Sequence, residues 1–91
     1  MIIVKTQLGT GGEWYTEARF AVGPVNLMHA VRVAQEAKRQ TAGIGGYLTV
    51  IEIDGKVLSE WEGEWPEDVS EARAVLGWRP KAAADGQLRL F

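Results

Sequence analysis

Few side chains in this sequence could do chemistry, and their spacing favours no catalytic or metal site. The chain has no cysteine and one histidine, His29, which falls on the polar side of an expected helix. A metal site needs three or more ligands, so a lone histidine is better explained as a surface residue. The glycines within 9–12 lack the Gly-Lys-Ser/Thr signature of a phosphate-binding loop and fit a hairpin loop instead. We therefore expect no enzymatic activity and no metal or cofactor.

Acidic side chains concentrate in one stretch of the chain. Residues 52–71 contain eight acids and a single base, Lys56, whereas the formal net charge of the whole chain is only −2. Within this stretch Glu60, Glu62 and Glu64 alternate, which predicts three carboxylates on one face of a strand. Carboxylates can serve in hydrolysis or bind a metal. Because the pattern contains no opposing acids, a solvated edge strand explains them better.

The first half of the chain predicts a hairpin followed by a helix. Residues 2–8 and 14–22 alternate in the manner of half-buried strands. One face of the second strand is expected to carry Trp14, Thr16, Ala18, Phe20 and Val22. Asn26 is a suitable N-cap for a helix that runs to about Gln40. The apolar stripe of this helix is expected to consist of Leu27, Ala30, Val31, Ala34 and Ala37.

The second half predicts another hairpin and a shorter helix. Asp54-Gly55 separates two runs rich in β-formers, and both residues tolerate the positive φ angles of a type I′ turn. The outgoing strand is expected to continue to residue 65, so that one of its faces carries Val57, Ser59, Trp61 and Trp65. Pro66 is expected to open a helix that ends at Gly77.

These elements predict an α+β fold with the order ββαββα, in which a four-stranded antiparallel sheet carries two helices on one face. A chain of 91 residues is long enough for one domain. We expect this domain over residues 1–78, a linker over 79–86 and a short C-terminal tail over 87–91. No stretch approaches the roughly 20 apolar residues of a membrane span, and we expect no leader in the first residues. A cytoplasmic protein without membrane contact is the expectation.

The last residues, Gln-Leu-Arg-Leu-Phe, resemble the bacterial sliding-clamp-binding motif, which has the pattern Gln-Leu-x-Leu-Phe. Gln87, Leu88, Leu90 and Phe91 match its four defining positions, and Arg89 stands at the variable place, where Ser or Asp is preferred. The resemblance implies a non-enzymatic interaction module that docks on the clamp, to recruit itself to DNA replication or repair or to interfere with them. The composition also suits a peptide ligand, since apolar anchors enter pockets and a glutamine fixes the register.

A second structure for the same residues is open. Asp85-Gly86 is also a suitable hairpin turn, and residues 87–91 alternate as an edge strand does. In that case Leu88 and Leu90 would dock on the sheet, and the tail would not be displayed to a partner.

The acidic stretch supports an alternative function of a different class. Spaced carboxylates can imitate the phosphates of a nucleic acid and attract a basic groove. The residues of this acidic surface are Glu60, Glu62, Glu64, Glu67, Asp68 and Glu71. In size and element order the chain is similar to small phage anti-CRISPR proteins, which implies a phage-encoded inhibitor (anti-CRISPR or anti-restriction type) of a nucleic-acid-handling protein complex. The simpler alternative is charge that keeps a small domain soluble.

The sequence also bears on two other kinds of partner, nucleic acid and a second copy of the chain. Arg32, Lys38 and Arg39 place positive charge along the first helix, but three bases beside Glu36 are few for a nucleic-acid-binding stripe. We therefore do not expect direct nucleic-acid binding. An unpaired edge strand leaves a homodimer open.

Overall fold

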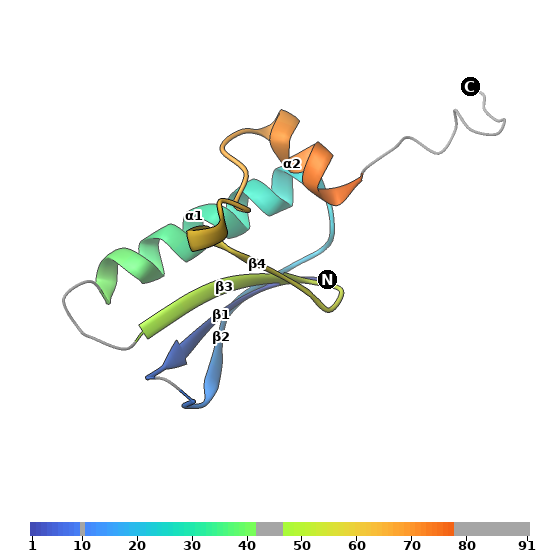
Figure 1. Ribbon diagram of the computed structural model, residues 1–91. Coiled ribbons are helices and arrows are strands. Elements are labelled where there is room, and N and C mark those ends of the chain that lie inside the picture. The colour runs from blue at the N-terminus through green and yellow to red at the C-terminus, as the bar shows by residue number, and fades with distance from the viewer. Residues whose placement is uncertain (10, 42–46, 78–91) are drawn as a thin grey trace, which may run out of the picture.

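The computed structural model describes residues 1–9, 11–41 and 47–77, and it confirms the α+β class. Four strands form one antiparallel sheet in the order β2-β1-β3-β4. The strands are β1 (Ile2–Leu8), β2 (Trp14–Phe20), β3 (Tyr47–Ile53) and β4 (Lys56–Ser59). The helices are α1 (Pro24–Gln40), between β2 and β3, and α2 (Val69–Leu76), after β4. Figure 1 shows both helices on the same side of the sheet, with α2 packed on α1.

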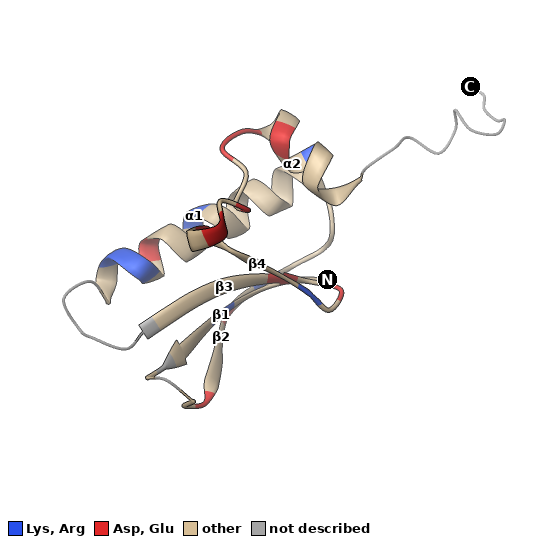
Figure 2. Ribbon diagram, in the orientation of Figure 1, with Lys and Arg blue, Asp and Glu red and all other residues tan. Residues whose placement is uncertain are grey.

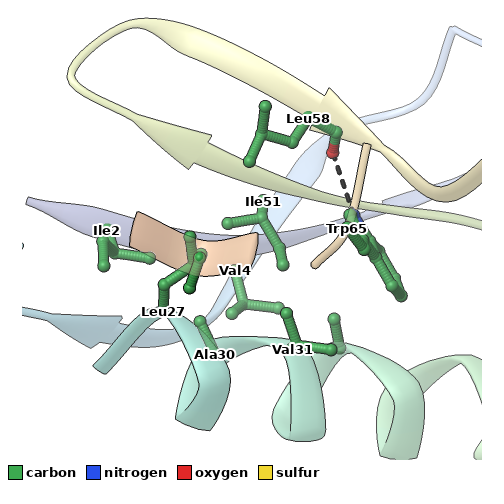
Figure 3. Close-up of a cluster of buried hydrophobic side chains, with 10 residues drawn as sticks. Ile2, Val4, Leu27, Ala30, Val31, Ile51, Leu58 and Trp65 are labelled. Atoms are coloured by element: carbon green, nitrogen blue, oxygen red, sulfur yellow. Dashed lines mark hydrogen bonds between the residues drawn. The ribbon is translucent and has the colours of Figure 1, made fainter. Parts of the chain in front are cut away.

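The core lies between α1 and the inner face of the sheet, the face that the helices cover (Figure 3). Alternation along β1 buries Ile2, Val4 and Thr6, which agrees with the expected half-buried strand. The predicted stripe of α1 is confirmed, because four of its residues are buried and Ala37 is half-buried. The buried apolar side chains are Ile2, Val4, Leu27, Ala30, Val31, Ala34, Val50, Ile51, Leu58, Trp65 and Ala72. Helix and sheet periodicity therefore determine most of the core.

The prediction that Trp14 and Thr16 share a face with Ala18, Phe20 and Val22 is wrong. The pairing of β1 with β2 shifts by one residue between Val4 and Lys5, which leaves Glu17 as an extra residue in β2. Successive side chains on a strand point to opposite faces, so one extra residue moves all those before it to the other face. Trp14 pairs with Gln7 on the outer face of the sheet, the face without helices, and is 44% exposed.

The second hairpin forms as predicted, but its outgoing strand is shorter than expected. Asp54 and Gly55 have φ angles of 49° and 91°, and they connect the paired residues Ile53 and Lys56. The strand β4 then ends at Ser59, and Glu60–Glu62 form a 3₁₀ helix, η1. The order of elements is therefore ββαββηα, and the predicted order ββαββα is wrong at this point.

The chain leaves the strand geometry here because two contacts close a tight loop. The backbone N–H of Ser59 donates to the Glu64 carboxylate at 2.9 Å, and the backbone N–H of Glu64 donates back to the Ser59 carbonyl oxygen at 3.2 Å. Gly63 adopts a left-handed conformation with φ of 73°, which is favourable for glycine. The loop returns the chain over the sheet, so that Trp65 enters the core.

Both helices begin at other residues than the sequence predicts. Helix α1 starts at Pro24, with Gly23 as the N-cap, because the fixed φ of proline suits the first helical position. The side-chain amide of Asn26 instead donates to the carbonyl oxygen of Ala21 at 3.0 Å. Helix α2 starts at Val69, since the Asp68 side chain caps it, rather than at Pro66.

The end of α2 agrees with the prediction, and it closes the described part of the chain. Gly77 is left-handed, with φ of 61°, and terminates the helix. The expected linker over 79–86 and the peptide over 87–91 lie outside the described residues.

The Asp68 cap provides a test of how α2 is held. Its carboxylate accepts a hydrogen bond from the backbone N–H of Glu71 at 2.8 Å. We expect Asp68→Ala to lower the free energy of unfolding by about 1 kcal/mol, because an N–H at the helix start loses its partner. Asp68→Asn, which can still accept this bond, should lower the free energy of unfolding by only a few tenths of a kcal/mol. Equal losses for both variants in chemical denaturation would contradict the capping role.

Candidate interaction surface

The outer face of the sheet carries a shallow groove of about 320 Å³, which we call the outer groove. Strand register explains why its residues meet. Lys5 pairs with Val50, and Glu52 pairs with Val57, so all four side chains point away from the helices. The lining residues are Lys5, Trp14, Leu48, Val50, Glu52, Val57 and Trp61.

The outer groove is mainly apolar and open to solvent. Trp61 is 62% exposed and Val57 51% exposed, while Val50 at the centre is only 4% exposed. Together with Trp14 and Leu48, these side chains leave apolar area on the order of 400 Å² open. A contiguous apolar patch of this size on a small domain is typical of a contact surface.

The polar residues of the outer groove neutralise each other. The Lys5 Nζ lies 2.5 Å from Oε1 of Glu52, and both side chains are partly buried. The two residues lie on β1 and β3, the adjacent central strands of the sheet. The groove therefore presents an apolar surface with little net charge, which suits apolar side chains better than a charged ligand.

The expectation that Trp61 and Trp65 share one face of a strand is wrong, because the strand β4 ends at Ser59. The structure assigns Trp65 to the core, where its indole Nε1–H donates to the carbonyl oxygen of Leu58 at 3.1 Å (Figure 3). It assigns Trp61 and Trp14 to the outer groove, while Trp78 lies outside the described residues. The groove was not predicted, because a bulge places Trp14 there and a 3₁₀ turn places Trp61 there.

The acids around η1 gather as the sequence suggests, but not as a row on a strand. Figure 2 shows them along η1 and the turn into α2. Glu60 lies in the 3₁₀ helix and forms an ion pair with Lys38 of α1. Glu64 binds the backbone of Ser59, as described above. The expected alignment of Glu60, Glu62 and Glu64 on one strand face is therefore wrong.

The acids at the start of α2 bind backbone N–H groups there. Asp68 accepts from the backbone N–H of Glu71, whose own carboxylate accepts from the backbone N–H of Glu67 at 2.7 Å. Four of the six predicted acids thus have bonding partners within the domain. For the carboxylates of Glu62 and Glu67, no hydrogen bond or ion pair occurs among the residues that the structure describes.

The bases of α1 are also largely engaged. Lys38 pairs with Glu60, and the Arg39 guanidinium lies 2.5 Å from the Glu36 carboxylate. Hydrogen bonding from Arg39, followed by its charge and a bond from Gln40, holds the pKa of Glu36 below its ordinary value. Within the described part of α1, Arg32 is the base that forms no ion pair. This arrangement gives no positive stripe for nucleic acid.

The single histidine, His29, packs against an aromatic ring. The ring of His29 stacks on that of Phe20, with centroids 6.3 Å apart. Over residues 1–9, 11–41 and 47–77, no group of three potential ligands is placed to hold a metal ion. In the same ranges, no helix has the length and apolar character needed to span a bilayer.

The predicted peptide residues Gln87, Leu88, Leu90 and Phe91 lie outside the described residues, but the place where the chain leaves the domain is clear. At the end of α2, Val75 and Leu76 line a shallow depression together with residues of the second hairpin, which include Ile53, Asp54, Lys56 and Leu58. The C-terminal segment therefore starts beside the edge strand β4.

Comparison with known proteins gives no relative. No protein-family model, no curated protein and no solved structure matches this chain.

Proposed function

We propose that the protein is a non-enzymatic interaction module that docks on the bacterial sliding clamp through its last five residues. The observation that supports it is the agreement of Gln87, Leu88, Leu90 and Phe91 with the four defining positions of the clamp-binding pattern. Docking would bring the domain to replicating or repaired DNA, or would deny the clamp to other users.

The architecture of the domain is compatible with a separate binding peptide. The described residues build a four-stranded sheet and a core among themselves, and α2 ends at a glycine cap. Nine residues, 78–86, lie between that cap and Gln87. Extended, they reach about 30 Å, which is enough to let the peptide enter a groove while the domain stays outside it.

Direct titration tests this proposal. Purified sliding clamp is titrated with the full chain by calorimetry, first alone and then with an excess of synthetic Gln-Leu-Arg-Leu-Phe peptide. We expect saturable binding that the peptide abolishes by competition, since both would occupy the same groove. Binding that survives the competitor, or no binding, would contradict docking through the tail.

The alternative, an inhibitor that presents an acidic surface to a nucleic-acid-handling protein, has one specific observation in its favour. The carboxylates of Glu62 and Glu67 are exposed, and no described residue binds them. They lie beside the remaining acids of η1 and α2 (Figure 2). Because its other acids have partners, such a surface would depend mainly on these two.

A charge reversal tests the alternative without disturbing those partners. Glu62→Lys with Glu67→Lys should weaken binding to a purified CRISPR effector or restriction enzyme at least tenfold, because the carboxylates would face a basic groove. Glu13→Lys with Glu17→Lys, exposed acids of the β1–β2 hairpin, is the matched control. Binding in the parent should also fall steeply with salt. Indifference to salt and to the reversal would remove this candidate.

A further inference from the structure

We propose that the outer groove holds the chain's own residues 87–91 when no partner is bound, so that the groove and the partner compete for one peptide. The docking is argued from the described domain and the amino-acid sequence alone. The competition with the sliding clamp rests in addition on the proposed function. The protein would then present its clamp-binding peptide only when the peptide leaves the groove.

The tail starts close enough to the outer groove to reach it. Val75 and Leu76, at the end of α2, line the same depression as Lys56 and Leu58 of β4. Val57 lies between these two strand residues, and its side chain points to the opposite face, into the outer groove. The tail has only to pass around β4, which is an edge strand. Residues 78–86 reach about 30 Å when extended, several times the spacing of about 4.8 Å between adjacent strands, so a path around this one strand is within reach.

The chemistry of the tail matches that of the outer groove. Leu88, Leu90 and Phe91 are apolar, and the groove offers two tryptophan rings together with Leu48 and Val57. Its Lys5–Glu52 pair is internally neutralised, so burying it under apolar side chains leaves no single unpaired charge. A volume of about 320 Å³ lies at the lower end of the range for ligand pockets, which suits a few side chains rather than a helix.

Tethering favours the chain's own tail over a second copy. A second copy would have to bind the outer groove from solution, at the concentration of the free chain. A peptide joined by a short linker has an effective concentration in the millimolar range, so a contact of modest strength is enough to keep it docked.

A spin label can locate the tail in the full chain. Because the chain has no cysteine, Asp85→Cys provides a single attachment site beside the peptide. We expect the label to broaden the indole signals of Trp14 and Trp61 and the methyl signals of Val57 more than those of Val75. Val75 lies nearer the start of the tail, so an undocked tail would affect it at least as strongly. Equal or stronger broadening at Val75 would overturn the proposal.

Substitutions on both sides of the contact sharpen this experiment. Leu88→Ser with Phe91→Ser, or Val57→Lys in the groove, should remove the selective broadening. Val25→Lys is the matched control, because Val25 is a similarly exposed valine at the start of α1. Lysine on an exposed edge strand is well tolerated, so Val57→Lys should stay folded. Selective broadening that persists in the tail variant would overturn the proposal. So would broadening between labelled and unlabelled chains in a mixed sample, which would indicate a second copy.

Clamp titration of the same variants separates this inference from the proposed function. If the tail is docked in nine chains of ten, Val57→Lys should tighten clamp binding about tenfold, since the whole population becomes competent. Clamp binding without selective broadening would overturn the groove and leave the proposed function intact. Selective broadening in a chain that binds no clamp would support the docking and overturn the proposed function.

Discussion

Replacing Leu88 and Phe91 together with alanine is expected to weaken binding to a bacterial sliding clamp by about 100- to 1,000-fold. Each is an apolar anchor of the clamp-binding pattern, and anchors of this kind contribute about 2 kcal/mol or more to a peptide interface. Two such losses amount to about 4 kcal/mol, and every 1.4 kcal/mol is a factor of ten in affinity, so the intrinsic loss is about 1,000-fold. The same substitutions would also release a tail that is docked in the outer groove in nine chains of ten, which would return up to a factor of ten. Calorimetric titration of the full-length variant against the parent measures the change.

A matched control and a stability measurement make this result specific. Arg89→Ala changes the variable place of the pattern and should alter the affinity less than about threefold. The free energy of unfolding of the double variant should fall by no more than about 1.4 kcal/mol, the value for a tail docked in nine chains of ten. If the double variant unfolds, residues 87–91 are a strand of the fold. If it binds the clamp unchanged, another surface carries the contact.

Trp65→Ala is expected to have the largest effect on stability. The side chain is 9% exposed and fills the space between the loop after η1 and the core (Figure 3). Removing a buried tryptophan costs about 3–5 kcal/mol, from lost apolar burial and from the cavity that remains. In a domain of this size such a loss corresponds to a decrease in Tm of roughly 15–30 °C, measurable by circular dichroism.

Two companion variants show whether packing is the cause. Trp65→Phe keeps most of the apolar volume but loses the indole N–H, which donates to the Leu58 carbonyl oxygen at 3.1 Å. It should cost about 1–2 kcal/mol, the value of one buried hydrogen bond plus a small volume change. Trp61→Ala, at an exposed position, should change the free energy of unfolding by less than about 1 kcal/mol. Equal losses at Trp61 and Trp65 would contradict the placement of these two side chains.

Local rules predicted those parts of the fold in which one residue type dictates one geometry. Alternation in residues 2–8 predicted a half-buried strand, and alternate side chains of β1 are buried. Asp54-Gly55 predicted the hairpin turn, because few other pairs accept positive φ at both positions. Helical periodicity gave the buried stripe of α1, and a glycine gave the end of α2.

The outer groove could not be predicted, because pairing between distant segments creates it. The bulge at Glu17 exists only in the register of β2 against β1, and nothing in the local sequence of β2 marks it. The turn at η1 replaces a segment whose alternation is that of a strand. Its cause is the Ser59–Glu64 contact and the burial of Trp65, and Gly63 was the only local sign.

The acidic surface illustrates a different limit of sequence reasoning. The concentration of acids was correctly located, yet its charges were read as free. In the structure Glu60 pairs with Lys38, and Asp68 and Glu71 accept hydrogen bonds from backbone N–H groups at the start of α2. A run of carboxylates therefore has to be discounted for those that bind backbone N–H groups or neighbouring bases before it is read as an imitation of nucleic acid.

Amide hydrogen exchange of the full chain, with and without saturating sliding clamp, tests the central claim most directly. We expect the clamp to slow exchange at Leu88 through Phe91, because the docked peptide would be held against the clamp groove, and to leave the amides of β1 and β3 unchanged. Unchanged exchange at 88–91 in the presence of the clamp, or slowed exchange only within 60–71, would contradict docking through the tail.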